Sequence, residues 1–247
     1  MTESFNPQRR SLLHVAAIAA VAAGTAKITN AHAAQEKPAM SALPAFQSQS
    51  APKPLAFDPT KLPGLSERLI RSHWENNYGG SVKALGVVKQ QLSEALANKD
   101  TPPYIYNALK REHLLRTGSV VLHEYYFDNL GGDGQAGAAE RKAIADSFGS
   151  FDNWETEFRR IGAGLGGGSG WVVLGFNTHT GQIENYWLGD HAHGPAATQP
   201  LLVMDMYEHS YQMDYGAAAA KYIDALFKNI QWDAVASRLE SAQRAMT

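Results

Sequence analysis

Four residues from three separate stretches of the sequence have side chains that together could bind a transition metal ion. They are His73, His123, Asp205 and His209. Imidazole nitrogens and a carboxylate oxygen suit manganese or iron, and they also suit zinc. The chain of 247 residues has nine His and no Cys, which excludes disulfides, thiol catalysis, iron–sulfur clusters and thiolate metal sites. Any metal must therefore be held by His and carboxylate side chains.

The spacing of these residues leaves simpler interpretations open. Asp205 and His209 are four residues apart and also fit a surface ion pair on a helix. His73 and His123 lie among apolar residues, where a hydrogen-bonded core histidine is a common structure. From chemistry alone, a site of three imidazoles and one carboxylate is one interpretation among these.

The pattern of apolar residues predicts two long helices that carry the first two histidines. One helix is expected over residues 63–92, with a bend or interruption at the glycines 79–80. The second is expected from residue 105 or 106 to 130, before a glycine-rich stop. The short, proline-containing connection at 101–103 predicts that the two helices form an antiparallel hairpin.

The second half of the chain has a different pattern. Helices are expected at 138–148, 151–161, 217–228 and 232–241, and strands at 170–177, 182–188 and 200–204. Asp205 and His209 then lie where the last strand runs into a helix. The fold class is therefore α+β: an N-terminal α-helical hairpin domain (55–131), then a C-terminal domain (132–247) of helices around a small three-stranded antiparallel sheet.

The N-terminus has the layout of a bacterial export signal over residues 1–33, with a basic start, a short apolar run and an Ala-His-Ala end. Arg9-Arg10 followed by Ser and two Leu resembles a twin-arginine signal, and an ordinary secretory signal that holds two arginines fits as well. We expect export to the periplasm, with no membrane attachment after signal cleavage. Residues 34–54, rich in Pro, Ser, Gln and Ala, are expected to be a flexible linker.

The composition is that of a globular protein that does not bind nucleic acid. Hydrophobic residues make up 44% of the chain, enough to bury a core. With 22 basic and 24 acidic residues, the chain lacks the excess positive charge that neutralises phosphates.

One segment of the sequence carries a recognisable signature. Residues 205–211 read Asp-Met-Tyr-Glu-His-Ser-Tyr and resemble the D-x-W-E-H-x-Y signature of the iron/manganese superoxide dismutases, with Tyr207 in the tryptophan position. Further segments are similar to other motifs of that family and occur in its order across residues 55–245; they lie at 63–74, 123–130, 148–158, 168–171 and 222–233.

The resemblance implies a ligand set, a cofactor and a reaction. The ligands would be His73, His123, Asp205 and His209, holding one iron or manganese ion per subunit together with a solvent molecule. The substrate would be the superoxide anion, disproportionated to O₂ and hydrogen peroxide as the ion alternately accepts and returns an electron. Hydrogen bonds to the bound solvent would set the redox potential.

The resemblance also implies roles for residues around the ligands. In the family a Gln usually donates to the bound solvent; here the helix position is Ser119, which is too short, and the loop position aligns with His191. His193 is the fallback, and both are also interpretable as exposed loop residues. Three aromatic residues would form a wall that excludes water, although they serve equally well as ordinary core: Trp171, Tyr207 and Phe127.

Glu208 and Tyr211 imply a homodimer. In the family the glutamate reaches across a two-fold axis to the metal-binding histidine of the partner subunit. The simpler interpretation of Glu208 is a carboxylate on a helix face.

Two positions depart from the family pattern. Its members carry a His and a Tyr, four and eight residues after the first ligand, that gate substrate and relay protons; this chain has Asn77 and Ser81 there. Tyr78 is expected to point roughly 60–100° away from the site on the 3.6-residue period. These changes favour an alternative, a non-catalytic metal-binding or structural dimer of the same fold. A zinc hydrolase is a third possibility, but only Glu208 is available as its general base.

Overall fold

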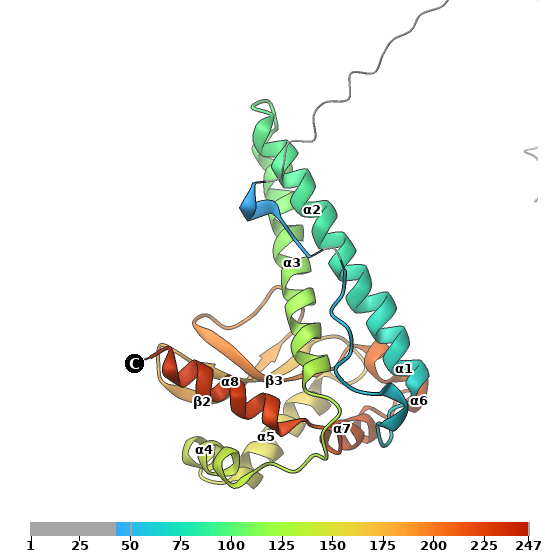
Figure 1. The fold of residues 1–247 in the computed structure, drawn as a ribbon, viewed down its shortest axis with the longest axis vertical. Helices are drawn as coiled ribbons and strands as arrows, with labels where there is room; N and C mark the ends of the chain where they lie inside the picture. The colour runs from blue at the N-terminus through green and yellow to red at the C-terminus, as the bar shows by residue number, and fades with distance from the viewer. Residues whose placement is uncertain (1–42, 50, 247) are drawn as a thin grey trace, which may run out of the picture. The chain divides into compact units, whose positions relative to one another are not determined.

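The computed structural model describes residues 43–49 and 51–246. The predicted export signal (1–33) and the first part of the predicted linker (34–42) lie outside the described residues. A long helical hairpin rises from a base of shorter helices and one small sheet (Figure 1).

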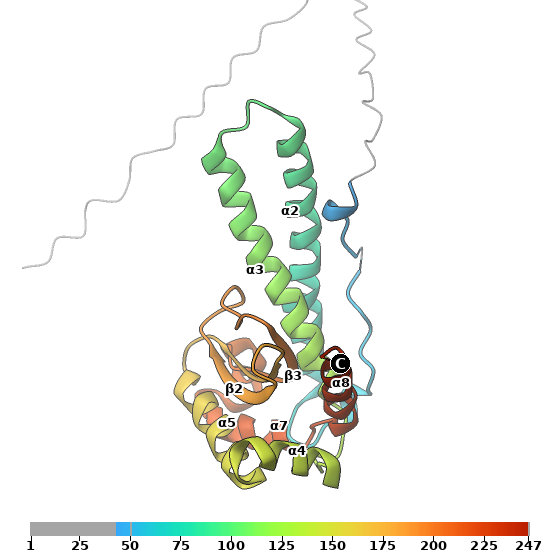
Figure 2. The same ribbon diagram turned by 90° about the vertical axis from the view of Figure 1, so that its left-hand side faces the viewer.

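The hairpin is built from one nearly continuous helical run and one long return helix. The run consists of α1 (Glu67–Ser72), the π-helical segment η3 (His73–Tyr78) and α2 (Gly79–Ala97), and α3 (Pro103–Asp128) returns beside it (Figure 2). The predicted bend at 79–80 is wrong, because Gly79 has ordinary α-helical angles (φ −61°, ψ −37°). The irregularity lies one turn earlier, in η3.

The C-terminal half packs short helices around the sheet. The elements are α4 (Ala138–Phe148), α5 (Phe151–Leu165), β1 (Trp171–Asn177), β2 (Gln182–Leu188), β3 (Thr198–Asp205), the 3₁₀ turn η4 (Glu208–Ser210), α6 (Gln212–Tyr215), α7 (Ala219–Phe227) and α8 (Trp232–Arg244). The strands pair antiparallel in the order β2-β1-β3. The predicted α+β class, with its helical hairpin and three-stranded sheet, is confirmed.

The central strand β1 explains why the C-terminal half has a pattern of continuous apolar runs. Six of its seven residues are buried, because it has a strand on each side and helices over its faces. Its first residue, Trp171, lies opposite both Leu188 of β2 and Asp205 of β3. This register brings the start of β1 and the last residues of β2 and β3 together at the base of the hairpin.

The end of the predicted flexible linker is held against the hairpin. We call residues 43–49 and 51–54 the N-terminal strap; the strap includes the 3₁₀ turn η1 (Pro44–Phe46). Trp74 Nε1 donates to the carbonyl of Lys53 at 2.8 Å, and Lys89 Nζ donates to that of Gln47 at 2.6 Å. The flexible-linker prediction is therefore wrong for this part of the chain, because its backbone finds fixed hydrogen-bond partners on the helices.

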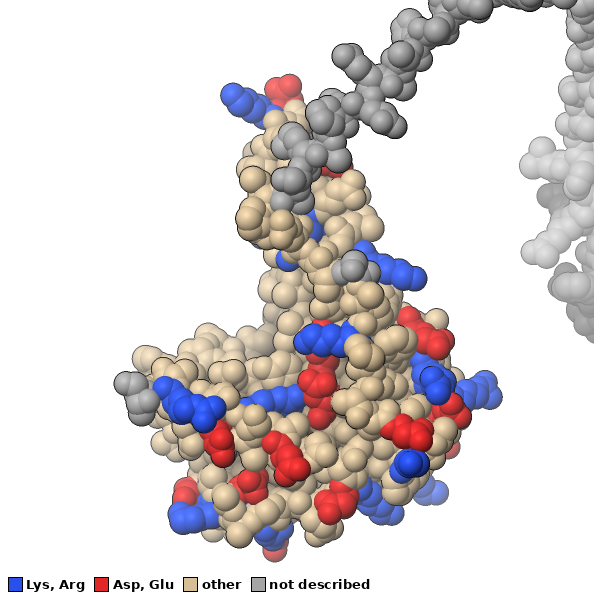
Figure 3. Space-filling model, in the orientation of Figure 1, with Lys and Arg blue, Asp and Glu red and all other residues tan. Residues whose placement is uncertain are grey.

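The visible surface mixes charges of both signs around the base, with fewer on the hairpin (Figure 3). Within residues 43–49 and 51–246, no helix combines the length and the apolar character that crossing a membrane requires.

Candidate metal centre

Four side chains from four elements converge at the base of the hairpin. The ligand atoms of His73, His123, Asp205 and His209 all lie within 4.8 Å of one another. Asp205 Oδ2 is the common point: the Nε2 atoms of His73, His209 and His123 lie 3.1, 3.2 and 3.7 Å from it. The structure thus brings together all four ligands predicted from the sequence.

Each ligand lies on a different element of the fold. His73 is the first residue of η3, and His123 lies on the inner side of α3. Asp205 is the last residue of β3, and His209 lies in η4 just beyond it. Asp205 is fully buried at the end of a strand, so the alternative of a surface ion pair on a helix is excluded.

The protonation states match those that a metal ion requires. Burial lowers the pKa of His123 to about 3, and burial lowers that of His73 in spite of the neighbouring carboxylate. Burial alone would raise the pKa of Asp205, but the attraction of His209 and His73 outweighs it and holds the pKa well below its ordinary value. Neutral imidazoles around an ionised carboxylate are the form that binds metals.

Several donor atoms of this cluster have no protein partner. Nδ1 and Nε2 of His73 and Nε2 of His123 are buried without a hydrogen bond, although His73 Nε2 lies close to Asp205. A buried carboxylate among neutral groups also lacks a balancing charge. A cation bound to the three imidazoles and Asp205 would satisfy both needs, so the residues fit an iron or manganese ion.

Hydrogen bonds outside the cluster orient two of the ligands. His123 Nδ1 lies 2.7 Å from the carbonyl of Ser119, to which it donates, leaving Nε2 as the free electron-pair donor. Asp205 Oδ1 accepts a hydrogen bond from the backbone N–H of Tyr207 at 2.8 Å. The carbonyl of Asp205 accepts from the hydroxyls of Tyr222 and Ser210 at 2.7 and 2.9 Å.

The predicted aromatic residues surround the cluster. The ring centroid of Phe127 lies 5.0 Å from that of His73, Trp171 lies 5.0 Å from His123, and Tyr207 lies 5.3 Å from His209. Burial and, to a smaller extent, the charge of nearby Asp205 raise the pKa of Tyr207 to about 12, so its hydroxyl keeps its proton at neutral pH.

His191 also reaches the cluster, on a loop after β2. Its ring centroid lies 5.9 Å from that of His123. The ring stacks on that of Tyr207, with a centroid distance of 4.7 Å and an interplanar angle of 12°. Trp171 Nε1 donates to His191 Nδ1 at 3.0 Å. The fallback residue His193 is exposed and pairs with Asp190 at 2.7 Å, so His191 is the histidine of this loop that the structure brings to the site.

Around the altered gate positions, the direction of Tyr78 differs from the prediction. Ser81 is buried, and its hydroxyl lies 2.8 Å from that of Ser119, while Asn77 is half-buried. Tyr78, which a regular α-helix would direct away, is buried with its ring stacked 6.3 Å from His123. The π-helical turn, with its wider i→i+5 repeat, brings residue 78 back to the side of His73. No signal in the sequence marks this turn.

The two residues expected at a dimer interface have different surroundings. Glu208 is exposed next to His209. Tyr211 is only 1% exposed, stacks on Tyr222 and accepts a hydrogen bond from the N–H of Gly167 at 3.0 Å. The interface role predicted for Tyr211 is therefore replaced by a role within its own chain, since it has no free surface to offer a partner.

Comparisons with known proteins agree with this geometry. The model of the C-terminal domain of iron/manganese superoxide dismutases matches residues 136–238. A superoxide dismutase [Fe] of Cupriavidus metallidurans is 50% identical over 192 residues, which cover 78% of this chain and 97% of that protein. A superoxide dismutase [Fe] of Aquifex aeolicus is 34% identical (76% and 90% covered), and a superoxide dismutase [Mn] of Haloferax volcanii is 32% identical (77% and 94%). The chain belongs to the iron/manganese superoxide dismutase family.

Proposed function

We propose that this protein disproportionates superoxide at one iron or manganese ion held by His73, His123, Asp205 and His209. The observation that carries the proposal is the convergence of three imidazoles on one buried, ionised carboxylate. A bound Fe or Mn ion supplies one-electron redox chemistry, through which two superoxide anions and two protons give one O₂ and one hydrogen peroxide.

The surrounding residues control water, charge and protons. Phe127, Trp171 and Tyr207 keep bulk water from the ligands, which strengthens the attraction between the site and a small anion. The hydrogen bond from Trp171 occupies Nδ1 of His191, so neutral His191 carries its proton on Nε2. This N–H is the donor that takes the place of the family's Gln amide and orients the solvent ligand.

The alternatives have less support. The changed gate residues favour a non-catalytic dimer, but all four ligands converge, and a relative that is 50% identical is a superoxide dismutase [Fe]. A zinc hydrolase needs a general base beside the bound water, and Glu208, its one candidate, is exposed.

The test is superoxide disproportionation per bound metal, on mature protein purified with its native metal and reconstituted separately with Fe and with Mn. Fast turnover with one metal identifies the cofactor. Tight binding of both metals without activity above that of the free ions contradicts the proposal and supports the non-catalytic alternative.

We also propose that the protein is exported to the periplasm and acts as a homodimer. The basic, apolar and Ala-x-Ala layout of residues 1–33 supports export. The exposed Glu208 beside His209 supports a two-fold contact in which it reaches His209 of the partner subunit. Fractionation of the native host and light scattering of the mature protein test the two points separately.

A further inference from the structure

Gly118 lies in the middle of α3 for no reason that the helix itself provides. Glycine in a helix interior costs about 1 kcal/mol relative to alanine, and α3 runs unbroken for ten residues beyond it. Such a glycine usually has a packing reason.

The packing reason is the loop that carries His191. A Cβ atom placed on Gly118 would lie 1.7 Å from the carbonyl oxygen of His191 and 2.8 Å from its carbonyl carbon. Both atoms are backbone, so no side-chain rotation could relieve the clash. Among the glycines in the described part of the chain, none would have an atom closer to an added Cβ than this one. The backbone of His191 thus packs directly against α3, in the space that a side chain at position 118 would occupy.

The same loop is fixed by four further contacts. Asp190 Oδ1 accepts hydrogen bonds from the backbone N–H groups of Ala192 and His193 at 2.7 and 3.1 Å, which close the loop into a tight turn. On the other side of the imidazole, Trp171 Nε1 donates to Nδ1, and the ring stacks on Tyr207. The helix therefore limits how far the loop retreats from the sheet, while the aromatic residues hold the ring.

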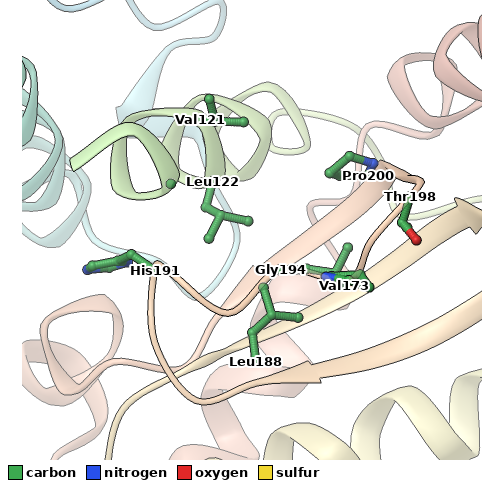
Figure 4. Close-up of a pocket in the computed structure, with 10 residues that line it drawn as sticks. Val121, Leu122, Val173, Leu188, His191, Gly194, Thr198 and Pro200 are labelled. Atoms are coloured by element: carbon green, nitrogen blue, oxygen red, sulfur yellow. The ribbon is translucent and has the colours of Figure 1, made fainter. Parts of the chain in front are cut away.

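A cavity beside this contact would let the loop move without unfolding the protein. Gly118 and His191 both line an apolar cavity of about 240 Å³, together with Leu122, Val173 and Leu188. Figure 4 shows the loop with His191 passing below α3 at one end of this cavity. A side chain at position 118 has room to push the loop aside instead of breaking the helix.

We infer that Gly118 is a positioning residue for His191: its missing side chain sets the distance at which the loop presents the imidazole to the four ligands. The inference rests on the proposed role of His191 as donor to the solvent ligand. A displacement of a donor in this position alters the redox potential of the ion and its affinity for small anions.

The experiment compares four iron-loaded mature proteins: wild type, Gly118→Ala, Gly80→Ala and His191→Ala. Gly80 is a matched control in the same hairpin, because a Cβ there meets nothing within 4 Å. Iron content, unfolding temperature, reduction midpoint potential and azide dissociation constant are measured for each. We expect Gly118→Ala to bind iron fully and to shift the midpoint in the same direction as His191→Ala, by roughly half as much or more, with Gly80→Ala unchanged.

A midpoint and azide affinity of Gly118→Ala equal to wild type, with His191→Ala shifted, overturns the inference. No shift in His191→Ala also overturns it, while dismutation by the wild type would leave the proposed function standing. If Gly118→Ala does not fold, Asp190→Ala opens the turn without touching the helix, and an unchanged midpoint there overturns the inference as well. Loss of dismutation in wild type itself is a separate result that contradicts only the proposed function.

Discussion

The indole Nε1 of Trp171 donates a hydrogen bond to Nδ1 of His191 at 3.0 Å, from the first residue of β1 to the loop after β2. An imidazole that accepts at Nδ1 has its proton on Nε2 when it is neutral, and burial lowers the pKa of His191, which favours the neutral form. A core residue of the sheet thereby selects the tautomer of a residue at the metal centre.

Trp171→Phe should therefore reduce dismutation more than it reduces stability. Without the indole N–H, His191 loses its fixed tautomer and orientation, and we expect turnover per bound metal to fall about 10–100-fold. Trp154→Phe is the matched control, since Trp154 is equally buried and donates to Asn185 far from the ligands. Both variants should lose about 1–3 kcal/mol of unfolding free energy. Equal turnover in the two variants would contradict the assigned role.

Asp205→Asn should abolish tight metal binding while keeping the fold. The amide has nearly the same size but no charge, so the three imidazoles lose the anion on which they converge. We expect metal affinity to fall by more than about 100-fold, measured as metal content after dialysis against a chelator. Asp224→Asn, which removes a surface pair with Arg159, should retain full metal content.

The metal-free protein should lose stability as the pH falls below about 6.5. His123 has a pKa of about 3 when folded, against an ordinary value of 6.5, so the unfolded chain binds an extra proton between these values. Unfolding free energy then falls with decreasing pH by up to about 1.4 kcal/mol per pH unit for this residue. Urea unfolding between pH 4 and 7 measures the slope. His123→Gln should flatten it, and replacement of the exposed His179 by Gln should not.

Tyr78→Phe should destabilise the contact between the strap and the hairpin. The Tyr78 hydroxyl accepts from the backbone N–H of Lys53 at 2.9 Å and donates to Glu124 at 2.8 Å. Its loss removes the acceptor of the Lys53 N–H and one donor to the half-buried Glu124, and should cost about 1–1.5 kcal/mol by thermal unfolding. Lys53→Met removes the 2.5 Å ion pair with Glu124, but this lysine is 62% exposed, so the loss should stay below about 1 kcal/mol. A larger effect from Lys53 than from Tyr78 would show that the ion pair holds the strap.

Glu208 and Tyr211 should respond differently to substitution. Glu208→Ala should shift the protein toward monomer in analytical ultracentrifugation, because its carboxylate is free for a partner. Tyr211→Phe should leave the oligomeric state unchanged and cost about 1–2 kcal/mol, since its hydroxyl binds Gly167 in the same chain. Dissociation caused by Tyr211→Phe instead would restore the interface role expected from the sequence.

The ligands could be predicted from the sequence, whereas several of their neighbours could not. The four ligands lie in segments that resemble the motifs of the family and occur in its order. The hairpin and the sheet follow from the periodicity of the apolar residues. The predicted direction of Tyr78 is wrong because periodicity assumes 3.6 residues per turn, and η3 does not keep that repeat.

Long-range contacts explain the other differences. Leu43 and Phe46 are the two large apolar residues of the strap, and neither is buried. The strap is held by backbone hydrogen bonds to Trp74 and Tyr78, which no local pattern reveals. The importance of Gly118 depends on a loop more than 70 positions away in the chain. Such contacts exist only once the fold has brought the segments together.

The strap has a consequence for how the N-terminus can be processed. A protease that trims the chain up to about residue 42 removes none of the hydrogen bonds to Trp74, Tyr78, Lys89 and Glu124. A cut after Lys53 would release the strap and leave the phenol of Tyr78 and the carboxylate of Glu124 without these partners. Limited digestion should therefore cut residues 43–53 slowly as long as the hairpin is folded.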